Sequence, residues 1–209
     1  LGLSTGLEYE PSLYSLTEEV IELAKVAASY GGKYSSHIRS EDVKVTEAID
    51  EVLTIAQGAN ISANISHIKL AMYALHGDAE SVLEKLDRAR SEGLDITADI
   101  YPYDGWKAPM AILMPERDYG DRAAAEYALS SIAAASSITI SDYEGQPSYA
   151  GKTLEGLAAE KEMDPIDPMM RLLQRAERDD LNERVIGRNI CQADIETFMQ
   201  WPFTEITTD

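Results

Sequence analysis

Two histidines, His37 and His67, occur 30 residues apart in nearly identical tetrapeptides, SHIR and SHIK. Neutral imidazoles on neighbouring strands can converge on a divalent metal such as zinc, which binds histidine nitrogen at about 2.0–2.1 Å. The repeated pattern therefore favours a metal site, with a buried or solvated histidine at each position as the alternative. Two imidazoles do not complete a zinc site, so a further ligand must come from another part of the chain.

A basic residue follows each histidine by two positions, Arg39 after His37 and Lys69 after His67. A cation beside a metal centre suits an anionic group of a substrate, such as a carboxylate. A solvated basic residue at the end of a strand is the alternative for each of them.

Other residues carry less specific signals. Tyr101 follows a predicted strand, where a phenol can donate a hydrogen bond to a developing oxyanion or simply pack at the rim. Asp209 ends the last predicted strand and could accept a proton from metal-bound water, although a terminal aspartate by itself proves nothing. Cys191 has no neighbouring histidine and is predicted to be an ordinary thiol. Acidic pairs such as Glu8 and Glu10 are predicted to lie on the solvated surface.

Strands and helices alternate in the first half of the chain, and they must position these side chains. Hydrophobic periodicity predicts helices over 17–30, 43–57 and 79–91, and strands over 33–38, 60–65 and 95–100. Gly58 is expected to end the second helix, and Asp78 to cap the third. Short connections between alternating elements predict a parallel sheet, and hence an α/β enzyme scaffold built of βα repeats. Equal repeat lengths would place His37 and His67 side by side at the carboxyl ends of adjacent strands.

A change of composition after Tyr103 indicates a separate segment. Residues 104–190 contain an alanine-rich helix, a short strand and two further helices, predicted over 123–135, 138–141, 153–161 and 165–177. The segment is too long for a single connection, so it is predicted to be an insertion that packs over the carboxyl end of the sheet as a lid. A last helix over 194–200 and a strand over 204–208 follow. The predicted domains are βα repeats in 1–103, a lid insertion in 104–190, and the last helix and strand in 191–209.

Composition restricts the class of protein. The chain has 18 basic and 37 acidic residues and a formal charge of −19, which argues against nucleic-acid and anionic-membrane partners. Hydrophobic residues make up 44% of it, enough for a substantial core. No apolar run reaches the ~18–20 residues that cross a bilayer, no secretory signal pattern opens the sequence, and one cysteine excludes an internal disulfide. These features predict a globular, cytoplasmic protein.

Both ends of the chain lie at predicted strands. Leu1 is not a methionine and stands in an apolar strand, and Asp209 directly follows another strand. Because strand edges need covering, a self-contained domain seldom starts and stops inside sheet elements. We therefore expect the sequence to be a piece of a longer chain.

Six short segments stand in a fixed order along the chain. They are GLSTGLEYEP at 2–11, SHIRSE at 36–41, ISHIK at 65–69, ADIYPY at 98–103, GKTL at 151–154, and the run from WPF at 201–203 to TD at 208–209. Together they resemble the N-acyl-D-amino-acid deacylases (D-aminoacylases) of the amidohydrolase superfamily, and the ordered set is more specific than any one motif. The resemblance implies the carboxyl-terminal part of a metal-dependent (β/α)8 barrel. It also implies hydrolysis of the amide of an N-acyl-D-amino acid to a carboxylate and a free D-amino acid.

The resemblance further implies roles for residues of this chain. The zinc (Zn²⁺) ligands of the fifth and sixth barrel strands match His37 and His67, and the aspartate that acts as general base and acid matches Asp209. The insertion after the seventh strand corresponds to the family's lid. The family's lysine that holds the substrate carboxylate matches Lys69. Its tyrosine that lines the substrate site matches Tyr9, and the one that polarises the scissile carbonyl matches Tyr101.

Several parts of the family pattern have no counterpart in this sequence. These are the H-x-H pair of the first strand, a bridging cysteine or glutamate, the small β domain, and an arginine beyond the last strand. Residues 104–107 (DGWK) also replace small and hydroxyl residues, which leaves the acyl preference open. We therefore expect these 209 residues alone to bind zinc poorly and to show no deacylase activity.

Two alternatives to a deacylase remain open. Another amidohydrolase, similar to dihydroorotases or hydantoinases and acting on cyclic amides, normally supplies a carboxylated lysine on the fourth strand. The strand end at 1–6 contains no lysine, which slightly disfavours this alternative. A degenerate, non-catalytic scaffold would keep the fold and bind a small acidic ligand or a protein. Stoichiometric zinc in the full-length protein would argue against the scaffold.

Overall fold

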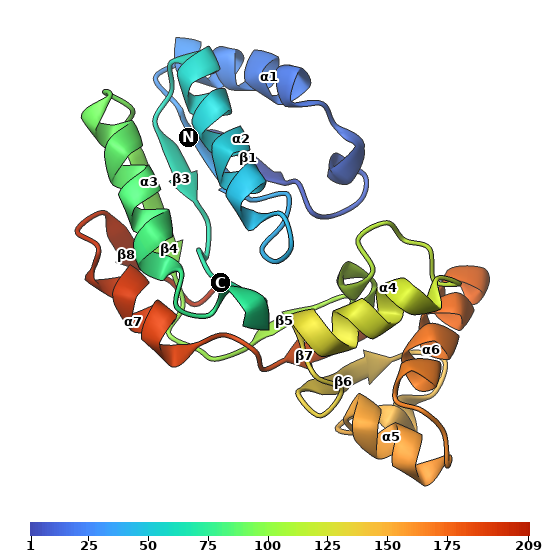
Figure 1. Cartoon of the computed structure of the whole chain (residues 1–209). Helices are drawn as coiled ribbons and strands as arrows, with labels where there is room; N and C mark the ends of the chain where they lie inside the picture. Colours follow the sequence, from blue (N-terminus) through green and yellow to red (C-terminus); the bar gives the residue numbers. More distant parts are fainter. The chain divides into compact units, whose positions relative to one another are not determined.

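A parallel five-stranded sheet carries the histidines. In the computed structural model, which describes residues 1–209, its strands are β1 (Gly2–Gly6), β2 (Lys33–His37), β3 (Ala63–Ile65), β4 (Ile96–Ile100) and β8 (Thr204–Ile206). They stand in the order β1-β2-β3-β4-β8, and every neighbouring pair is parallel (Figure 1). The predicted α/β class with a parallel sheet is therefore confirmed.

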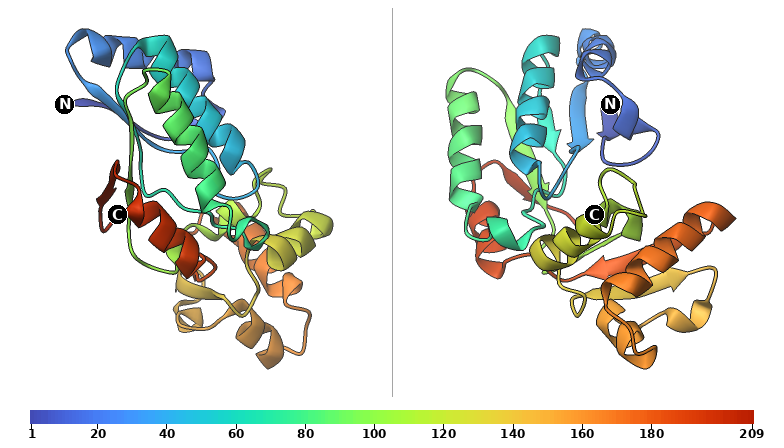
Figure 2. Two further views of the ribbon diagram at one scale, coloured as in Figure 1. Left: turned by 60° about the vertical axis from the view of Figure 1, so that its left-hand side comes forward. Right: turned by 45° about the vertical axis from the view of Figure 1, so that its right-hand side comes forward.

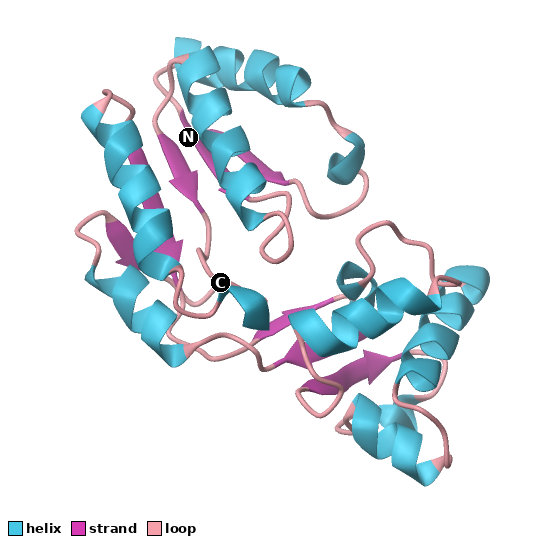
Figure 3. Ribbon diagram, in the orientation of Figure 1, coloured by secondary structure: helices cyan, strands magenta, loops and turns pink.

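Amphipathic helices connect these strands and pack against the sheet (Figure 3). They are α1 (Thr17–Ser29), α2 (Val45–Ala59), α3 (Ala79–Ser91) and α7 (Gln192–Gln200). Each helix buries one stripe of apolar residues spaced three or four positions apart, such as Ala48, Val52 and Ile55 of α2. The predicted helix ranges match the observed ones to within two residues, and the range of α3 matches at both ends.

Gly58 does not end α2 as predicted. It lies inside the last turn, where an added Cβ would meet the side chain of Ile21 in α1 at 3.1 Å. The glycine therefore allows α1 and α2 to pack closely. The helix ends at Ala59, and Asn60 takes the left-handed conformation at its C-cap, with φ of 50°. Because Asn60 belongs to this cap, the strand predicted from residue 60 begins only at Ala63.

The first turn of α3 is capped by another helix. Asp78 stands at the N-cap, but its side chain makes no capping hydrogen bond, contrary to the prediction. Instead the carboxylate of Asp194 in α7 accepts hydrogen bonds from the backbone N–H groups of Gly77 and Ala79, at 2.9 and 3.4 Å. This buried carboxylate thus joins α7 to the start of α3.

The two faces of the parallel sheet differ in polarity. Helices α1, α2 and α3, coloured blue, cyan and green in Figure 2, lie along one face. Tyr34 and Ile65 are fully buried and, by the strand register, their side chains share one face of the sheet. On the other face Asn64 links neighbouring strands through its side-chain amide, which donates to Asp99 at 2.7 Å and accepts from Thr97 at 2.9 Å. The polar face therefore has a side-chain hydrogen-bond network of its own.

A second group of elements lies between Tyr103 and Ile190. Three antiparallel strands form a separate sheet in the order β5-β7-β6, with β5 at Trp106–Ala108, β6 at Ile138–Tyr143 and β7 at Glu183–Gly187. The helices of this group are α4 (Arg122–Tyr127), α5 (Leu154–Glu160) and α6 (Ile166–Asp179). Neither β5 nor β7 is predicted from the sequence, since β5 has only three residues and the two strands pair with each other across a long stretch of chain.

The alanine-rich helix predicted over 123–135 is wrong at its carboxyl end. The α-helix stops at Tyr127 and continues as a π-helical turn over Ala128–Ile132, after which the chain is extended. The buried side chain of Asn189 donates a hydrogen bond to the carbonyl of Ile132 at 3.0 Å. A tertiary hydrogen bond thus occupies an acceptor that a longer helix would use.

The chain divides into two compact units. The first comprises Leu1–Leu70, Leu75–Pro102 and Cys191–Asp209, and the second comprises Ala71–Ala74 and Tyr103–Ile190. The role of residues 104–190 as a lid stays a prediction. Among the helices of the structure there is none with both the length and the apolar character needed to span a membrane.

Candidate metal centre

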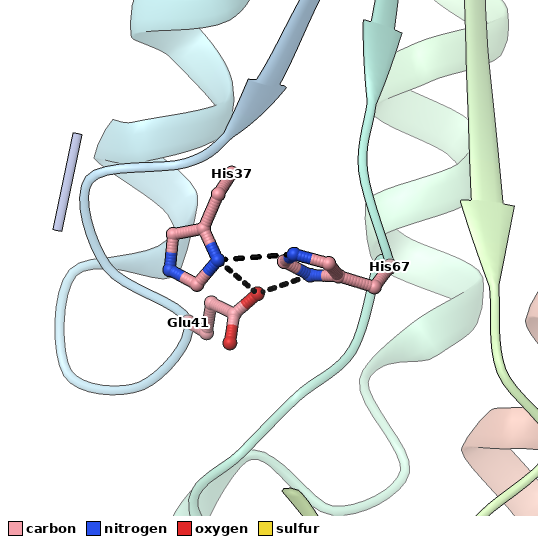
Figure 4. Close-up of side chains that lie close together, drawn as sticks. All are labelled: His37, Glu41 and His67. Carbon is pink, nitrogen blue, oxygen red and sulfur yellow. Dashed lines mark hydrogen bonds and ion pairs between the residues drawn. The ribbon is translucent and has the colours of Figure 1, made fainter. Parts of the chain in front are cut away.

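The structure brings His37 and His67 together at the carboxyl ends of adjacent strands (Figure 4). His37 is the last residue of β2, and His67 follows the end of β3 by two residues, with Ser36 opposite Ile65 in the register. The ring centroids are 4.6 Å apart, and His37 Nδ1 lies 3.0 Å from His67 Nε2. The 30-residue interval thus places the two imidazoles side by side.

The backbone of His67 has an uncommon conformation. Its φ of 40° lies in the left-handed region, which costs a residue with a side chain about 1–3 kcal/mol. Oδ1 of Asp99, on β4, accepts a hydrogen bond from the His67 N–H at 2.7 Å, while Oδ2 accepts from the Asn64 amide at 2.7 Å. Asp99 therefore offsets the strain and sets the direction in which the imidazole leaves the backbone. It is not among the site residues predicted from the sequence, although it lies in the ADIYPY segment.

A buried carboxylate lies beside each imidazole, at the ring nitrogen not turned toward the other ring. Glu8 Oε2 is 2.8 Å from His37 Nε2, and Glu41 Oε1 is 2.8 Å from His67 Nδ1. Both glutamates are 8% exposed, so the prediction that Glu8 lies on the solvated surface is wrong. The reason is a backbone hydrogen bond from Leu7 N–H to the His37 carbonyl at 3.0 Å, which draws the segment after β1 against the end of β2.

Glu41 is a site residue that the sequence reasoning missed. Its Oε1 is also 3.8 Å from His37 Nδ1, and the potential ligand atoms of His37, Glu41 and His67 all lie within 4.8 Å of one another (Figure 4). The signal that could have found it is its place four residues after His37, in the loop that leaves the same strand.

Lys69 is buried against Glu41 and His67. Its Nζ lies 2.5 Å from Glu41 Oε1, 3.1 Å from the His67 carbonyl oxygen and 2.9 Å from His67 Nδ1, and the residue is 4% exposed. The ammonium group of Lys69 thus lies beside the two imidazoles, in contact with acceptor atoms of the protein.

Arg39, the other cation singled out in the sequence, has structural partners. Its Nε and Nη2 donate to the carboxylate of Glu51 in α2, at 2.8 Å each. Nη1 and Nη2 also donate to the carbonyls of Leu13 and Ser15, at 2.8 and 3.1 Å. The guanidinium therefore ties the segment after β1 to α2, which differs from both roles expected for Arg39.

Two tyrosines and the last aspartate lie close to the imidazoles. The ring centroid of Tyr9 is 4.6 Å from that of His37, and that of Tyr101 is 6.2 Å from that of His67. Burial raises the pKa of both phenols, and nearby carboxylates raise it further, so both side chains stay protonated and can donate hydrogen bonds. Asp209 Oδ1 lies 3.9 Å from His67 Nε2, on a side chain that is 61% exposed.

Burial and neighbouring groups leave the two glutamates with different acidities. Burial raises the pKa of Glu8 above its ordinary value, and the hydrogen bond from His37 offsets this only in part. Burial also acts to raise the pKa of Glu41, but the Lys69 charge and the two imidazoles outweigh it and hold that pKa well below the ordinary range. Glu41 is therefore a carboxylate anion that only accepts hydrogen bonds.

Two arrangements of the imidazole protons differ in what lies between the two rings. In one, Lys69 donates to His67 Nδ1, His67 Nε2 donates to His37 Nδ1, and His37 Nε2 donates to Glu8. In the other, the His67 proton lies on Nδ1 and is donated to Glu41, so two lone pairs face each other across 3.0 Å. Lone pairs at that distance repel unless a cation lies between them. Two nitrogens bound to one tetrahedral zinc are about 3.3 Å apart, so this second arrangement fits a zinc ion.

Comparisons with known proteins point to one group of enzymes. No family model matches the chain. An N-acyl-D-glutamate deacylase of Alcaligenes xylosoxydans xylosoxydans is 42% identical over 117 residues, which are 56% of this chain and 23% of that protein. A D-aminoacylase of the same organism is 31% identical over 103 residues, which are 49% of this chain and 21% of that protein.

A solved structure covers nearly the whole chain. It is a crystal structure of the N-acyl-D-glutamate deacylase from Bordetella bronchiseptica, in complex with zinc and a phosphonate inhibitor that mimics the tetrahedral intermediate of the reaction. The TM-score is 0.79 at 28% identity, and the match covers 99% of this chain and 38% of that one. The chain thus spans 23% and 21% of the two curated relatives and 38% of the solved structure. The chain is thus similar to one part of the N-acyl-D-amino-acid deacylases, in sequence over about half of its length and in fold over nearly all of it.

Proposed function

We propose that the protein is a zinc-dependent deacylase that hydrolyses the amide bond of N-acyl-D-amino acids to a carboxylate and a free D-amino acid. The observation that carries the proposal is the pair of imidazole nitrogens 3.0 Å apart at the carboxyl ends of β2 and β3. Homology to deacylases, one of which has been solved with zinc, supports the same reaction.

The proposed zinc ligands are His37 Nδ1 and His67 Nε2. A bound zinc ion supplies a Lewis acid and lowers the pKa of a water molecule to about 7. Asp209 is the proposed general base, which accepts a proton from the attacking water and later delivers it to the leaving nitrogen. The 3.9 Å between its Oδ1 and His67 Nε2 supports this role.

Three further residues are proposed to act on the substrate. Tyr101 donates a hydrogen bond to the oxygen of the scissile carbonyl as negative charge develops there, and its raised pKa keeps the phenol protonated. Lys69 binds the substrate carboxylate through its ammonium group. Because Nζ already lies 2.5 Å from Glu41, the ammonium contacts Glu41 and the substrate carboxylate together. Tyr9 lines the substrate site beside His37.

We also propose the setting of this site. The five parallel strands would be the fourth to eighth strands of a (β/α)8 barrel, an assignment supported by their order β1-β2-β3-β4-β8. Residues 104–190, which separate β4 from β8 in the sequence, would form a lid that excludes water. A cytoplasmic location is proposed from the single free cysteine, Cys191.

Hydrolysis of N-acyl-D-amino acids by the intact protein, loaded with zinc, tests the proposal. We expect free D-amino acid from N-acetyl-D-glutamate or N-acetyl-D-methionine, and none from the L-enantiomers. His37→Ala and His67→Ala should each lose bound zinc and activity, whereas His76→Ala, a matched control, should keep both. Hydrolysis of only cyclic amides such as dihydroorotate would contradict the deacylase. A folded protein that binds no stoichiometric zinc would contradict any metal-dependent reaction.

A further inference from the structure

The two imidazoles are flanked by carboxylates in the same way. Each offers one nitrogen to the other imidazole and has a glutamate 2.8 Å from its second nitrogen, Glu8 at His37 Nε2 and Glu41 at His67 Nδ1. The two glutamates follow adjacent strands, β1 and β2, and both are buried. Carboxylates that accept the second N–H of a metal-bound histidine fix its tautomer and the orientation of its ring.

We propose that Glu8 and Glu41 are positioning residues that keep the protons of His37 and His67 on the outer nitrogens. The inner nitrogens, His37 Nδ1 and His67 Nε2, then present lone pairs toward one point. This inference rests on the proposed zinc site and adds to it the groups that select the metal-binding form of each ligand.

The outer nitrogens of the two imidazoles have different surroundings, because Lys69 contacts the outer nitrogen of His67 as well as Glu41. His67 Nδ1 has an acceptor, Glu41 Oε1, at 2.8 Å and a donor, Lys69 Nζ, at 2.9 Å. Donation from Lys69 favours the tautomer with the proton on Nε2, which cannot bind a metal through that nitrogen. Without Glu41 only the donor remains at Nδ1, so loss of Glu41 should weaken metal binding more than loss of Glu8.

Zinc affinity of the intact protein, measured by competition with a chromophoric chelator, tests the positioning role. We expect Glu8→Ala and Glu41→Ala to weaken binding by about 10–100-fold, with Glu41→Ala the weaker binder. Glu8→Gln should recover part of the loss, since its amide oxygen still accepts from the imidazole. The exposed residues Glu10 and Glu47 provide matched controls. Glu10→Ala and Glu47→Ala should stay within about twofold of the parent.

A second variant separates the tautomer from a general loss of structure. Adding Lys69→Met to Glu41→Ala removes the competing donor, so the double variant should bind zinc more tightly than Glu41→Ala alone. If Glu41 had a merely structural role, the double variant should bind zinc no more tightly than Glu41→Ala, because it also loses the buried Lys69 side chain. Nitrogen-15 shifts of the imidazoles in the zinc-free protein give a readout that needs no metal. The His67 proton should lie on Nε2 in Glu41→Ala and return toward Nδ1 in the double variant.

The outcomes distinguish the two proposals. If Glu8→Ala and Glu41→Ala are folded and bind zinc as the parent does, the positioning role is overturned while the zinc site stands. An unchanged His67 tautomer in Glu41→Ala also overturns it. If His37→Ala and His67→Ala bind zinc as tightly as the parent, the zinc site itself fails, and the positioning role fails with it.

Discussion

Replacing Asp99 by alanine should destabilise the protein and release the backbone of His67. A hydrogen bond to a charged acceptor contributes about 1.5–3 kcal/mol, and Asp99 accepts two of them, from His67 N–H and from the Asn64 amide, each at 2.7 Å. Their loss costs about 3–6 kcal/mol, and relaxation of the left-handed His67 recovers about 1–3 kcal/mol of it. The middle of the two ranges gives a net loss in the free energy of unfolding of about 2.5 kcal/mol, within limits of about 0 and 5 kcal/mol.

Urea unfolding of the intact protein, followed by far-UV circular dichroism, measures this loss. Asp99→Asn keeps an oxygen that accepts the His67 N–H, so it should cost only about half as much as Asp99→Ala. Asp95→Ala is the matched control: Asp95 is exposed, directly precedes β4 and pairs with Arg90 at 3.4 Å, and its loss should cost no more than about 1 kcal/mol. If Asp99→Ala is no less stable than Asp95→Ala, the claim that Asp99 holds the backbone of His67 is refuted.

Three further predictions concern other parts of the chain. Burial raises the pKa of Glu183 to about 7, so the folded state binds its proton more tightly than the unfolded chain, and stability falls as pH rises from about 4.5 to 7. Glu183→Gln should remove up to about 3 kcal/mol of this loss in the free energy of unfolding, measured by denaturant unfolding at a series of pH values. An unchanged dependence of stability on pH would contradict the role given to Glu183. Gly187→Ala should cost about 1–3 kcal/mol, seen as a lower Tm, because its Cβ would overlap the ring of Trp106; an equal Tm would show that the ring can move aside. Zinc at 100 times its Kd should raise the free energy of unfolding by about 2.7 kcal/mol, and the rise should be absent in His67→Ala.

The helices and strands of the parallel sheet could be predicted because the sequence patterns that indicate them are local. In α1, α2 and α3 a single apolar stripe repeats every three or four residues, and such a stripe follows from neighbouring residues alone. The interval between His37 and His67 was informative for a related reason. Adjacent parallel strands joined by similar helices bring equivalent positions to one level, so residues one repeat apart lie side by side.

The features missed in the sequence depend on distant partners. Strand β5 exists because Trp106 pairs with Gly187, 81 positions further along the chain, and nothing in the three residues of β5 indicates that partner. Glutamate is a residue type that usually lies on the surface. Glu8 is buried only because the segment after β1 is hydrogen-bonded to the end of β2. The burial of Glu41 likewise requires Lys69 and His67, which approach from the loop after β3.

Asn64 has a consequence for how homologous sequences can diverge. Its amide nitrogen donates to Asp99 at 2.7 Å and to Ser35 at 3.3 Å, and its oxygen accepts from Thr97 at 2.9 Å. An apolar residue at this position would deprive three side chains, Ser35 on β2 and Thr97 and Asp99 on β4, of a hydrogen bond in a single mutational step. We therefore expect residues 35, 64, 97 and 99 to be retained or exchanged as a set in homologues of this chain.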